Sequence, residues 1–192
     1  MRLWPRKKWK KILLIVFVVF FAAGSVALAY VGIKMNSDVV SEIEILNAAG
    51  SKIALVIYHP GMTSLMKDVT YSFADGLVSN GWRVEVTTPS SEAPTDISGY
   101  DLLVLGSPVY GFTILPTIER QLARMGDLKK IDTVGILTAA GAPGDSASTM
   151  EKAILNSNGT VKKVIVLFGM APNEGDLSAV YLAEQAGKEI LP

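Results

Sequence analysis

The hydrophobic pattern divides the chain into an apolar N-terminal segment and a longer body, in which short apolar runs alternate with amphipathic stretches. Residues 12–33 are 22 residues without a charged side chain. At the helical rise such a segment spans about 33 Å, close to the roughly 30 Å hydrocarbon core of a bilayer. We therefore predict a transmembrane helix over 12–33, between a short N-terminus, 1–11, and a linker, 34–51, that leads into one domain, 52–192.

Short runs of aliphatic residues in the body predict strands that are buried on both faces, as in a parallel sheet. The predicted strands cover residues 52–58, 82–87, 102–106, 133–138 and 163–168. In the second of them, WRVEVT, apolar and polar residues alternate. This alternation predicts that residues 82–87 form an edge strand with one less buried side.

Between these runs, apolar residues recur at the spacing of one helix face, as Leu65, Val69 and Phe73 do. The predicted helices cover residues 64–80, 115–125, 146–156 and 177–190, the last with Asp176 as its N-cap. A short helix capped by Ser37 is possible in the linker. Alternation of strands and helices predicts right-handed βαβ units, and hence an α/β domain with a parallel sheet covered on both faces.

Charge is distributed unevenly along the chain, although the formal net charge is zero. Six basic residues and no acidic residue precede position 12: Arg2, Arg6, Lys7, Lys8, Lys10 and Lys11. All 18 acidic residues lie from Asp38 onward, against 12 remaining Lys and Arg. An acidic body argues against nucleic acid as a partner, because phosphate binding needs a basic face. The positive-inside rule keeps the N-terminus in the cytoplasm and places the C-terminal domain outside it.

Two interpretations of the apolar segment remain open. It is either an uncleaved signal anchor that contacts membrane lipid through residues 12–33, or a signal peptide cleaved after Ala29, since Ala27-Leu28-Ala29 fits an A-x-A site. The apolar run exceeds the roughly 7–15 residues of the apolar h-region of a signal peptide, which favours the anchor. Trp4, Trp9 and Tyr30 stand where interfacial aromatic residues are expected. The sequence thus predicts a single-pass membrane protein.

Turn residues follow the aliphatic run 102–106, in the segment from Ser107 to Phe112 that reads SPVYGF. In open α/β sheets, ligands bind at the carboxyl ends of the strands, so this loop is a candidate site. The loops that follow the first and fourth predicted strands would lie at the same edge. The chain has no cysteine and one histidine, His59, which leaves no set of metal ligands. It also has no G-x-S-x-G motif, and we predict no catalytic side chain.

The five predicted strands, the polar turn after the first and GSPVYG after the third resemble the flavodoxin family over about residues 52–190. The resemblance implies a three-layer, doubly wound α/β fold with a five-stranded parallel sheet in the order 2-1-3-4-5, and an FMN site at the ends of strands one, three and four. The residues it implies for cofactor binding are His59, Pro60, Gly61, Met62, Thr63, Ser64, Ser107, Pro108, Val109, Tyr110, Gly111, Phe112, Thr138, Ala139, Ala140 and Gly141.

By this resemblance, the hydroxyls of Thr63 and Ser64 and the amides at the start of the following helix would hold the phosphate. Tyr110 would stack on the isoalloxazine. The small residues after the fourth strand would let a planar ring approach the backbone. The family's phosphate loop approximates Ser/Thr-x-Thr-Gly-x-Thr; here the glycine is displaced, and Pro60 removes one amide donor.

The leading hypothesis is a membrane-tethered, flavodoxin-like domain that binds FMN and exchanges electrons with an unidentified redox partner. One alternative is a flavin-free binding or scaffold module at the outer face of the membrane, suggested by the altered phosphate loop. Another is an FMN-dependent quinone reductase, since a membrane tether would place the domain near quinones.

Overall fold

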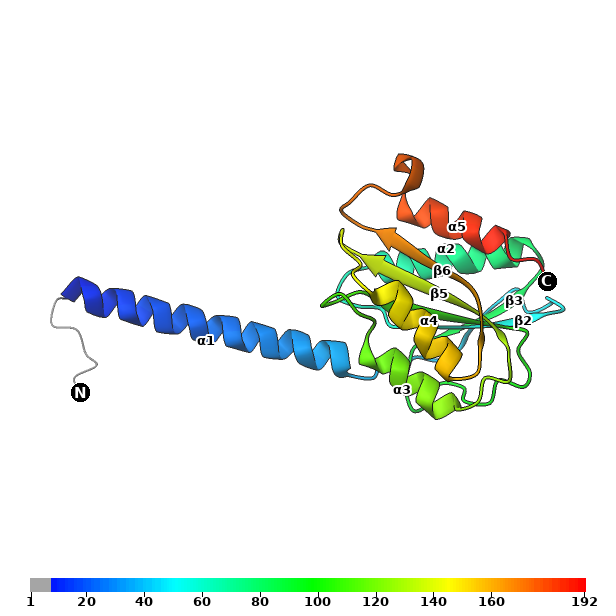
Figure 1. The fold of residues 1–192 in the computed structure, drawn as a ribbon, viewed down its shortest axis with the longest axis horizontal. Coiled ribbons are helices and arrows are strands. Elements are labelled where there is room, and N and C mark those ends of the chain that lie inside the picture. Colours follow the sequence, from blue (N-terminus) through cyan, green and yellow to red (C-terminus); the bar gives the residue numbers. More distant parts are fainter. Residues whose placement is uncertain (1–7) are drawn as a thin grey trace. The chain divides into compact units, whose positions relative to one another are not determined.

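The structure is a computed structural model that describes residues 8–192. Of the predicted N-terminus, Arg2, Trp4, Arg6 and Lys7 lie outside the described residues. The chain forms two compact units that meet between Ser37 and Asp38. The first unit is α1 (Lys8–Asn36), which has no buried residue and is long and apolar enough to cross a membrane (Figure 1).

The second unit is built on a sheet that has six strands within the described residues. Its parallel strands are β2 (Ile53–Tyr58), β3 (Arg83–Thr87), β4 (Leu102–Pro108), β5 (Asp132–Ala139) and β6 (Thr160–Phe168). A further strand, β1 (Glu44–Leu46), pairs antiparallel with β3, so the spatial order is β1-β3-β2-β4-β5-β6. The five parallel strands therefore have the predicted order 2-1-3-4-5.

Residues 34–51, predicted as a linker, supply the additional strand β1. Residues 37–51 contain no helix, so Ser37 is not an N-cap. Its Oγ instead donates a hydrogen bond to the carbonyl of Ile33 (2.7 Å) at the end of α1. Since β1 covers β3, the prediction that residues 82–87 form an edge strand is wrong. The alternation there has another cause: Glu85 is buried and binds Arg83 (2.6 Å) and the hydroxyl of Tyr100 (2.7 Å).

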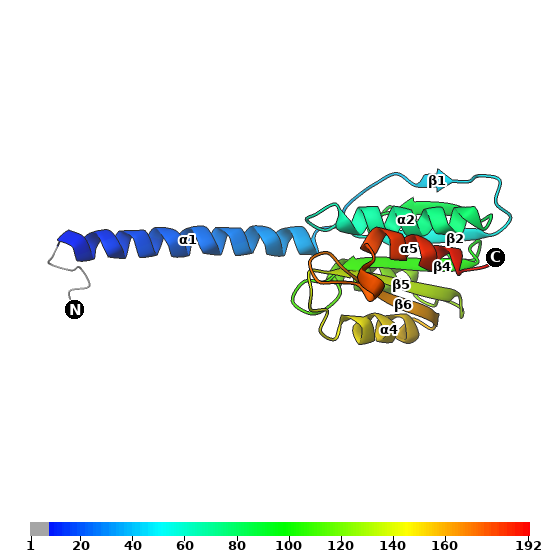
Figure 2. The same cartoon turned by 90° about the horizontal axis from the view of Figure 1, so that it is seen from above.

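Helices cover both faces of the sheet, as predicted (Figures 1 and 2). On one face lie α2 (Leu65–Ser79) and α5 (Ala179–Lys188), and on the other α3 (Pro116–Met125) and α4 (Ser146–Asn156). Successive strand residues point to opposite faces. Accordingly Val56 packs in the cluster with α2 and α5, and Leu55 in the cluster with α3 and α4. The three-layer α/β architecture is thus confirmed.

The start of α5 differs from the prediction. Asp176 is not its N-cap but the end of a short 3₁₀ turn, Glu174–Asp176, with a positive φ of 55°. The N-cap is Ser178, whose Oγ accepts a hydrogen bond from the amide of Tyr181 (3.1 Å). Both residue types are good caps, and the 3₁₀ turn determines which of them precedes the helix.

Candidate functional site

A cavity opens at the edge of the sheet where β2, β4, β5 and β6 end, and we call it the cleft. Its volume of 370 Å³ lies within the range of roughly 300–1,000 Å³ that is typical of small-molecule sites. The residues that line it come from the ends of these strands, from the loops that follow them and from the first residue of α2: Thr63, Leu65, Pro108, Val109, Tyr110, Thr138, Ala139, Ala140, Gly169 and Met170. The carboxyl ends of parallel strands thus form its floor, as expected for an open α/β sheet.

The lining of the cleft is mostly apolar, and none of its described residues is charged. Small side chains, such as those of Ala139 and Ala140, leave room for a flat group to approach the backbone. The hydroxyl of Thr138 is directed away from solvent and donates to Sδ of Met66 (3.5 Å). The lining of the cleft therefore suits a neutral, planar group better than a charged one.

The loop after β2 folds back on itself before α2 begins. The amide of His59 donates to the carbonyl of Gly106 (3.0 Å), which extends the pairing of β2 and β4 by one residue. The amide of Gly61 then donates to Nδ1 of His59 (3.1 Å). Gly61 has a φ of +74°, and a Cβ there would lie 3.1 Å from both Cγ of Pro108 and Oη of Tyr110. Glycine is therefore needed at position 61 for both conformation and space.

The phenol of Tyr110 joins this loop to the one after β4. Its Oη accepts a hydrogen bond from the amide of Met62 (3.0 Å). Tyr110 also forms an antiparallel bridge with Thr113. The two residues between them, Gly111 (φ 62°) and Phe112 (φ 67°), both have positive φ, as a type I′ turn requires. A positive φ is uncommon for a bulky residue such as Phe112, whose side chain is 64% exposed.

The N-terminus of α2 lies beside the cleft. Thr63 and Ser64 are exposed there, and Ser64 is the N-cap residue without a capping bond from its own side chain. The first helical bond runs from the amide of Asp68 to the carbonyl of Ser64 (2.9 Å). The three preceding amides have no acceptor within the helix, as at every helix N-terminus. Together with the two hydroxyls they form a place where an anion would be stabilised.

The sequence matches no family model and no curated protein. Solved structures do match the chain. A two-electron reduced flavodoxin from Megasphaera elsdenii has a TM-score of 0.58 at 16% identity, over 70% of this chain and 98% of that one. The NAD(P)H:quinone oxidoreductase from Methanothermobacter marburgensis has a TM-score of 0.54 at 18% identity, over 73% of this chain and 96% of that one. A flavodoxin from Streptococcus pneumonia TIGR4 has a TM-score of 0.56 at 17% identity, over 72% and 97%.

The chain has a flavodoxin-like fold. In this flavodoxin-like domain, seven of the residues implied by the sequence line the cleft: Thr63, Pro108, Val109, Tyr110, Thr138, Ala139 and Ala140. The others lie in the same loops, or in the strands that lead into them, without lining it: His59, Pro60, Gly61, Met62, Ser64, Ser107, Gly111, Phe112 and Gly141.

Ser107 has a different surrounding from the one its position in the sequence suggested. It is fully buried, and its Oγ accepts a hydrogen bond from the amide of Leu115 (2.9 Å) and donates one to the carbonyl of Pro108 (3.0 Å). Leu115 is the residue before α3. The hydroxyl of Ser107 therefore positions the start of α3.

Three lining residues of the flavodoxin-like domain were not predicted: Leu65, Gly169 and Met170. The last two follow β6, and their amides donate to the carbonyls of Ala139 (2.9 Å) and Ala140 (3.0 Å). A signal was present in the sequence, since Gly169 directly follows the aliphatic run of the fifth predicted strand. The rule that ligands bind at the ends of parallel strands applies to that strand as well.

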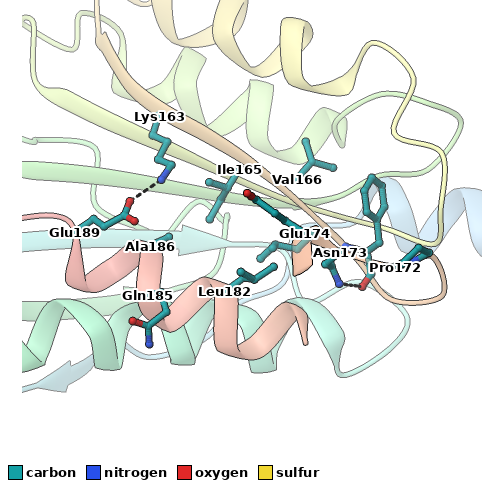
Figure 3. A pocket seen from close by; sticks show the side chains of 12 residues that line it. Lys163, Ile165, Val166, Pro172, Asn173, Glu174, Leu182, Gln185, Ala186 and Glu189 are labelled. Atoms are coloured by element: carbon teal, nitrogen blue, oxygen red, sulfur yellow. Dashed lines mark hydrogen bonds and ion pairs between the residues drawn. The ribbon is translucent and has the colours of Figure 1, made fainter. Parts of the chain in front are cut away.

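A second cavity, of 420 Å³, lies between β6 and α5 and reaches the loop that follows β6 (Figure 3). At one end Lys163 pairs with Glu189 (2.7 Å). At the other, Asn173 binds both backbone groups of Phe168, accepting from the amide (2.7 Å) and donating to the carbonyl (3.0 Å). These contacts are internal to the fold. The Asn173 bonds hold the loop that carries Gly169 and Met170 against the cleft.

Proposed function

We propose that this domain binds FMN in the cleft and acts in electron transfer at a membrane, to which α1 tethers it. The observation that carries the proposal is an uncharged cleft of 370 Å³ at the carboxyl ends of the parallel strands, next to the N-terminus of α2. The flavin would supply the redox chemistry, and the protein would supply binding and orientation.

The residues of the cleft fit the two ends of such a ligand. Thr63, Ser64 and the first amides of α2 would hold the phosphate. Tyr110 would flank the ring, and Ala139 and Ala140 would let it lie close to the backbone. No lining residue is charged, so the chain itself offers no acid or base at the ring, and the proposed role is electron transfer without a protein proton donor.

The test compares FMN with riboflavin, which lacks only the phosphate. The full chain is purified in detergent, and binding of each flavin is followed by visible absorbance and by quenching of flavin fluorescence. We expect tighter binding of FMN. The double variant T63A/S64A should lose about tenfold or more in FMN affinity, equivalent to about 1.4 kcal/mol or more, and should keep its riboflavin affinity.

The matched control is S51A, which removes a hydroxyl from an exposed turn before β2, outside the residues of the cleft. It should bind both flavins as the parent chain does. A folded protein that binds neither flavin would contradict the proposal.

A flavin-free binding module is the second candidate, and one feature of the loop after β2 favours it. Two of its amides already have partners inside the protein: Gly61 donates to His59 (3.1 Å) and Met62 to Tyr110 (3.0 Å). Neither amide is available to a phosphate while these bonds persist. A colourless protein that remains folded would support this role, and a flavin retained through purification from the native membrane would rule it out.

An FMN-dependent quinone reductase is the third candidate. One similar structure is itself an NAD(P)H:quinone oxidoreductase. One assay distinguishes a quinone reductase from an electron carrier. A reductase turns over steadily with NAD(P)H and a soluble quinone, whereas an electron carrier is reduced once and is not reoxidised until its protein partner is added.

A further inference from the structure

The chain joins the flavodoxin-like domain at the same edge of the sheet as the cleft. The segment that follows α1 runs beside the end of β3. The amide of Val39 donates to the carbonyl of Pro89 (3.4 Å), and the amide of Thr88 donates to Oγ of Ser41 (3.2 Å). Thr88 directly follows β3, whose neighbours in order are β2 and then β4. Two strand spacings separate β3 from β4, so this junction lies about 10 Å from the cleft.

The covalent connection between the apolar helix and this junction is short. Charge-free sequence ends at Ile33, α1 ends at Asn36, and the domain begins at Asp38. Three residues at helical rise and two extended residues bridge at most about 12 Å. The headgroup layer on one side of a bilayer is about 5–7 Å thick. If α1 spans the membrane, the junction therefore lies at or just above the headgroups.

Exposed apolar side chains gather on the loops at this edge, and we call them the apolar rim. They are Val40 (57% exposed), Ile43 (42%), Met62 (50%), Phe112 (64%) and Met170 (90%). Three of them follow the ends of β2, β4 and β6, and the other two belong to the segment that enters the domain. A surface region that exposes several large apolar side chains is a candidate for contact with a protein or a membrane.

Phe112 adds a second observation to this exposure. The turn that carries it holds a bulky residue at a φ of +67°, a conformation that costs free energy for a side chain with a Cβ. Phe112 does not line the cleft, its Cβ lies beside Gly144, and the residue remains 64% exposed, so most of its apolar surface has no partner in the isolated domain. Burial of that ring in a lipid interface would offset the cost.

We propose that the apolar rim rests in the interfacial layer of the bilayer that holds α1, so that the cleft opens at the membrane surface. A ligand that exchanges electrons at the cleft would then be reached from the lipid phase. The inference rests on the membrane tether of the proposed function and is independent of FMN. Exposed acidic side chains, among them Glu42, Asp145 and Asp176, also lie on these loops. The contact is therefore apolar rather than electrostatic, and zwitterionic lipid suits it best.

The test exploits the absence of cysteine from the chain. Single variants M62C, F112C and M170C of the full chain are labelled with an environment-sensitive fluorophore and reconstituted into phosphatidylcholine liposomes. Lipids with a quencher high on the acyl chain then report contact. We expect the three labels to be quenched at least threefold more strongly than a label on S51C, an exposed turn at the opposite edge of the sheet. High salt should leave the difference unchanged.

A label on V26C, within the apolar part of α1, separates the possible failures. Quenching at Val26 without extra quenching at the rim would overturn the inference and leave the tether intact. No quenching at Val26 would contradict the tether itself. Quenching at the rim that disappears at high salt would show an electrostatic contact. Labels at the rim that are shielded from solvent but not quenched by lipid would show a protein partner. Either result would overturn the proposed apolar contact with lipid.

Discussion

At the scale of single residues, Tyr110 determines how two loops of the cleft lie against each other. Its Oη accepts the amide of Met62 (3.0 Å), and its ring borders the cleft. We predict that Y110F lowers the free energy of unfolding by about 1 kcal/mol, the usual net value of one hydrogen bond. The aromatic ring remains, so a flavin would keep its stacking surface. Chemical denaturation followed by circular dichroism measures the change.

The control for this variant is Y181F, which removes a hydroxyl from a side chain that is 46% exposed on α5. We expect a change below about 0.5 kcal/mol there, as for most surface substitutions. Equal losses in the two variants would show that the Tyr110–Met62 bond has no particular role.

Asp38 is the residue at which the domain begins, and two arginines on α3 hold it. Partial burial works to raise the pKa of Asp38, but hydrogen bonds from Arg124 and Arg120 outweigh it and hold the pKa below its usual value. A lowered pKa in the folded state stabilises the protein above the unfolded value of about 3.9, and this stabilisation is lost as the pH falls through the folded value.

We therefore predict that D38N has a free energy of unfolding about 0.5 kcal/mol lower than that of the parent chain at pH 7. The effect is small because the side chains of Asp38, Arg120 and Arg124 are partly exposed and water screens their charges. The difference should begin to shrink below about pH 4 and disappear as the pH falls through the lowered pKa of Asp38. Denaturation at several pH values measures it, with E42Q, an exposed residue of the same segment, as the control. A difference that persists at low pH would contradict the ion-pair explanation.

At the scale of elements, two glycines determine how closely α2 and α5 pack. A Cβ on Gly76 would lie 2.3 Å from the carbonyl oxygen of Glu184, and one on Gly187 would lie 2.2 Å from that of Phe73. Both contacts are with backbone, so no side-chain rotation relieves them. The helices would have to separate, which would loosen the buried cluster around Phe73 and Ala183.

We predict that G187A destabilises the domain by about 1–3 kcal/mol, as overpacking in a core does. In a helix, alanine is more favourable than glycine by about 1 kcal/mol. Helix propensity alone would therefore stabilise G187A, so a lower free energy of unfolding must come from the packing of the added methyl group. The control is D75A, which introduces alanine on the exposed side of α2. Thermal unfolding of both variants provides the measurement, and a G187A protein as stable as the parent would show that the two helices can move apart without cost.

At the scale of the whole molecule, the charge pattern and α1 lead to a prediction of topology. The six basic residues before position 12 should remain in the cytoplasm, so that the flavodoxin-like domain lies outside. Alkaline phosphatase fused after Pro192 should therefore be active, and a fluorescent protein that folds only in the cytoplasm should stay dark at the same position. The reversed pair of results would place the domain in the cytoplasm.

Much of the architecture follows from local pattern. The run of aliphatic residues in β4 predicts a buried strand because a parallel sheet is covered on both faces, and the observed strand continues two residues beyond the predicted end, to Pro108. The loops after β2, β4 and β5 were predictable as neighbours, since parallel strands bring their carboxyl ends to one edge. The three-residue strand β1 was not, because so short a segment carries no periodic signal.

The sequence by itself determined the apolar helix, the alternation of strands and helices and the edge of the sheet where the cleft lies, because hydrophobic periodicity and the handedness of βαβ units act locally. The strand order was implied by the resemblance to flavodoxins. Only the tertiary structure decided what individual side chains do at that edge. It turned the hydroxyl of Ser107 toward α3, directed the phenol of Tyr110 to Met62 and covered β3 with β1. Each of these depends on contacts between different elements of the fold, and no local pattern encodes such contacts.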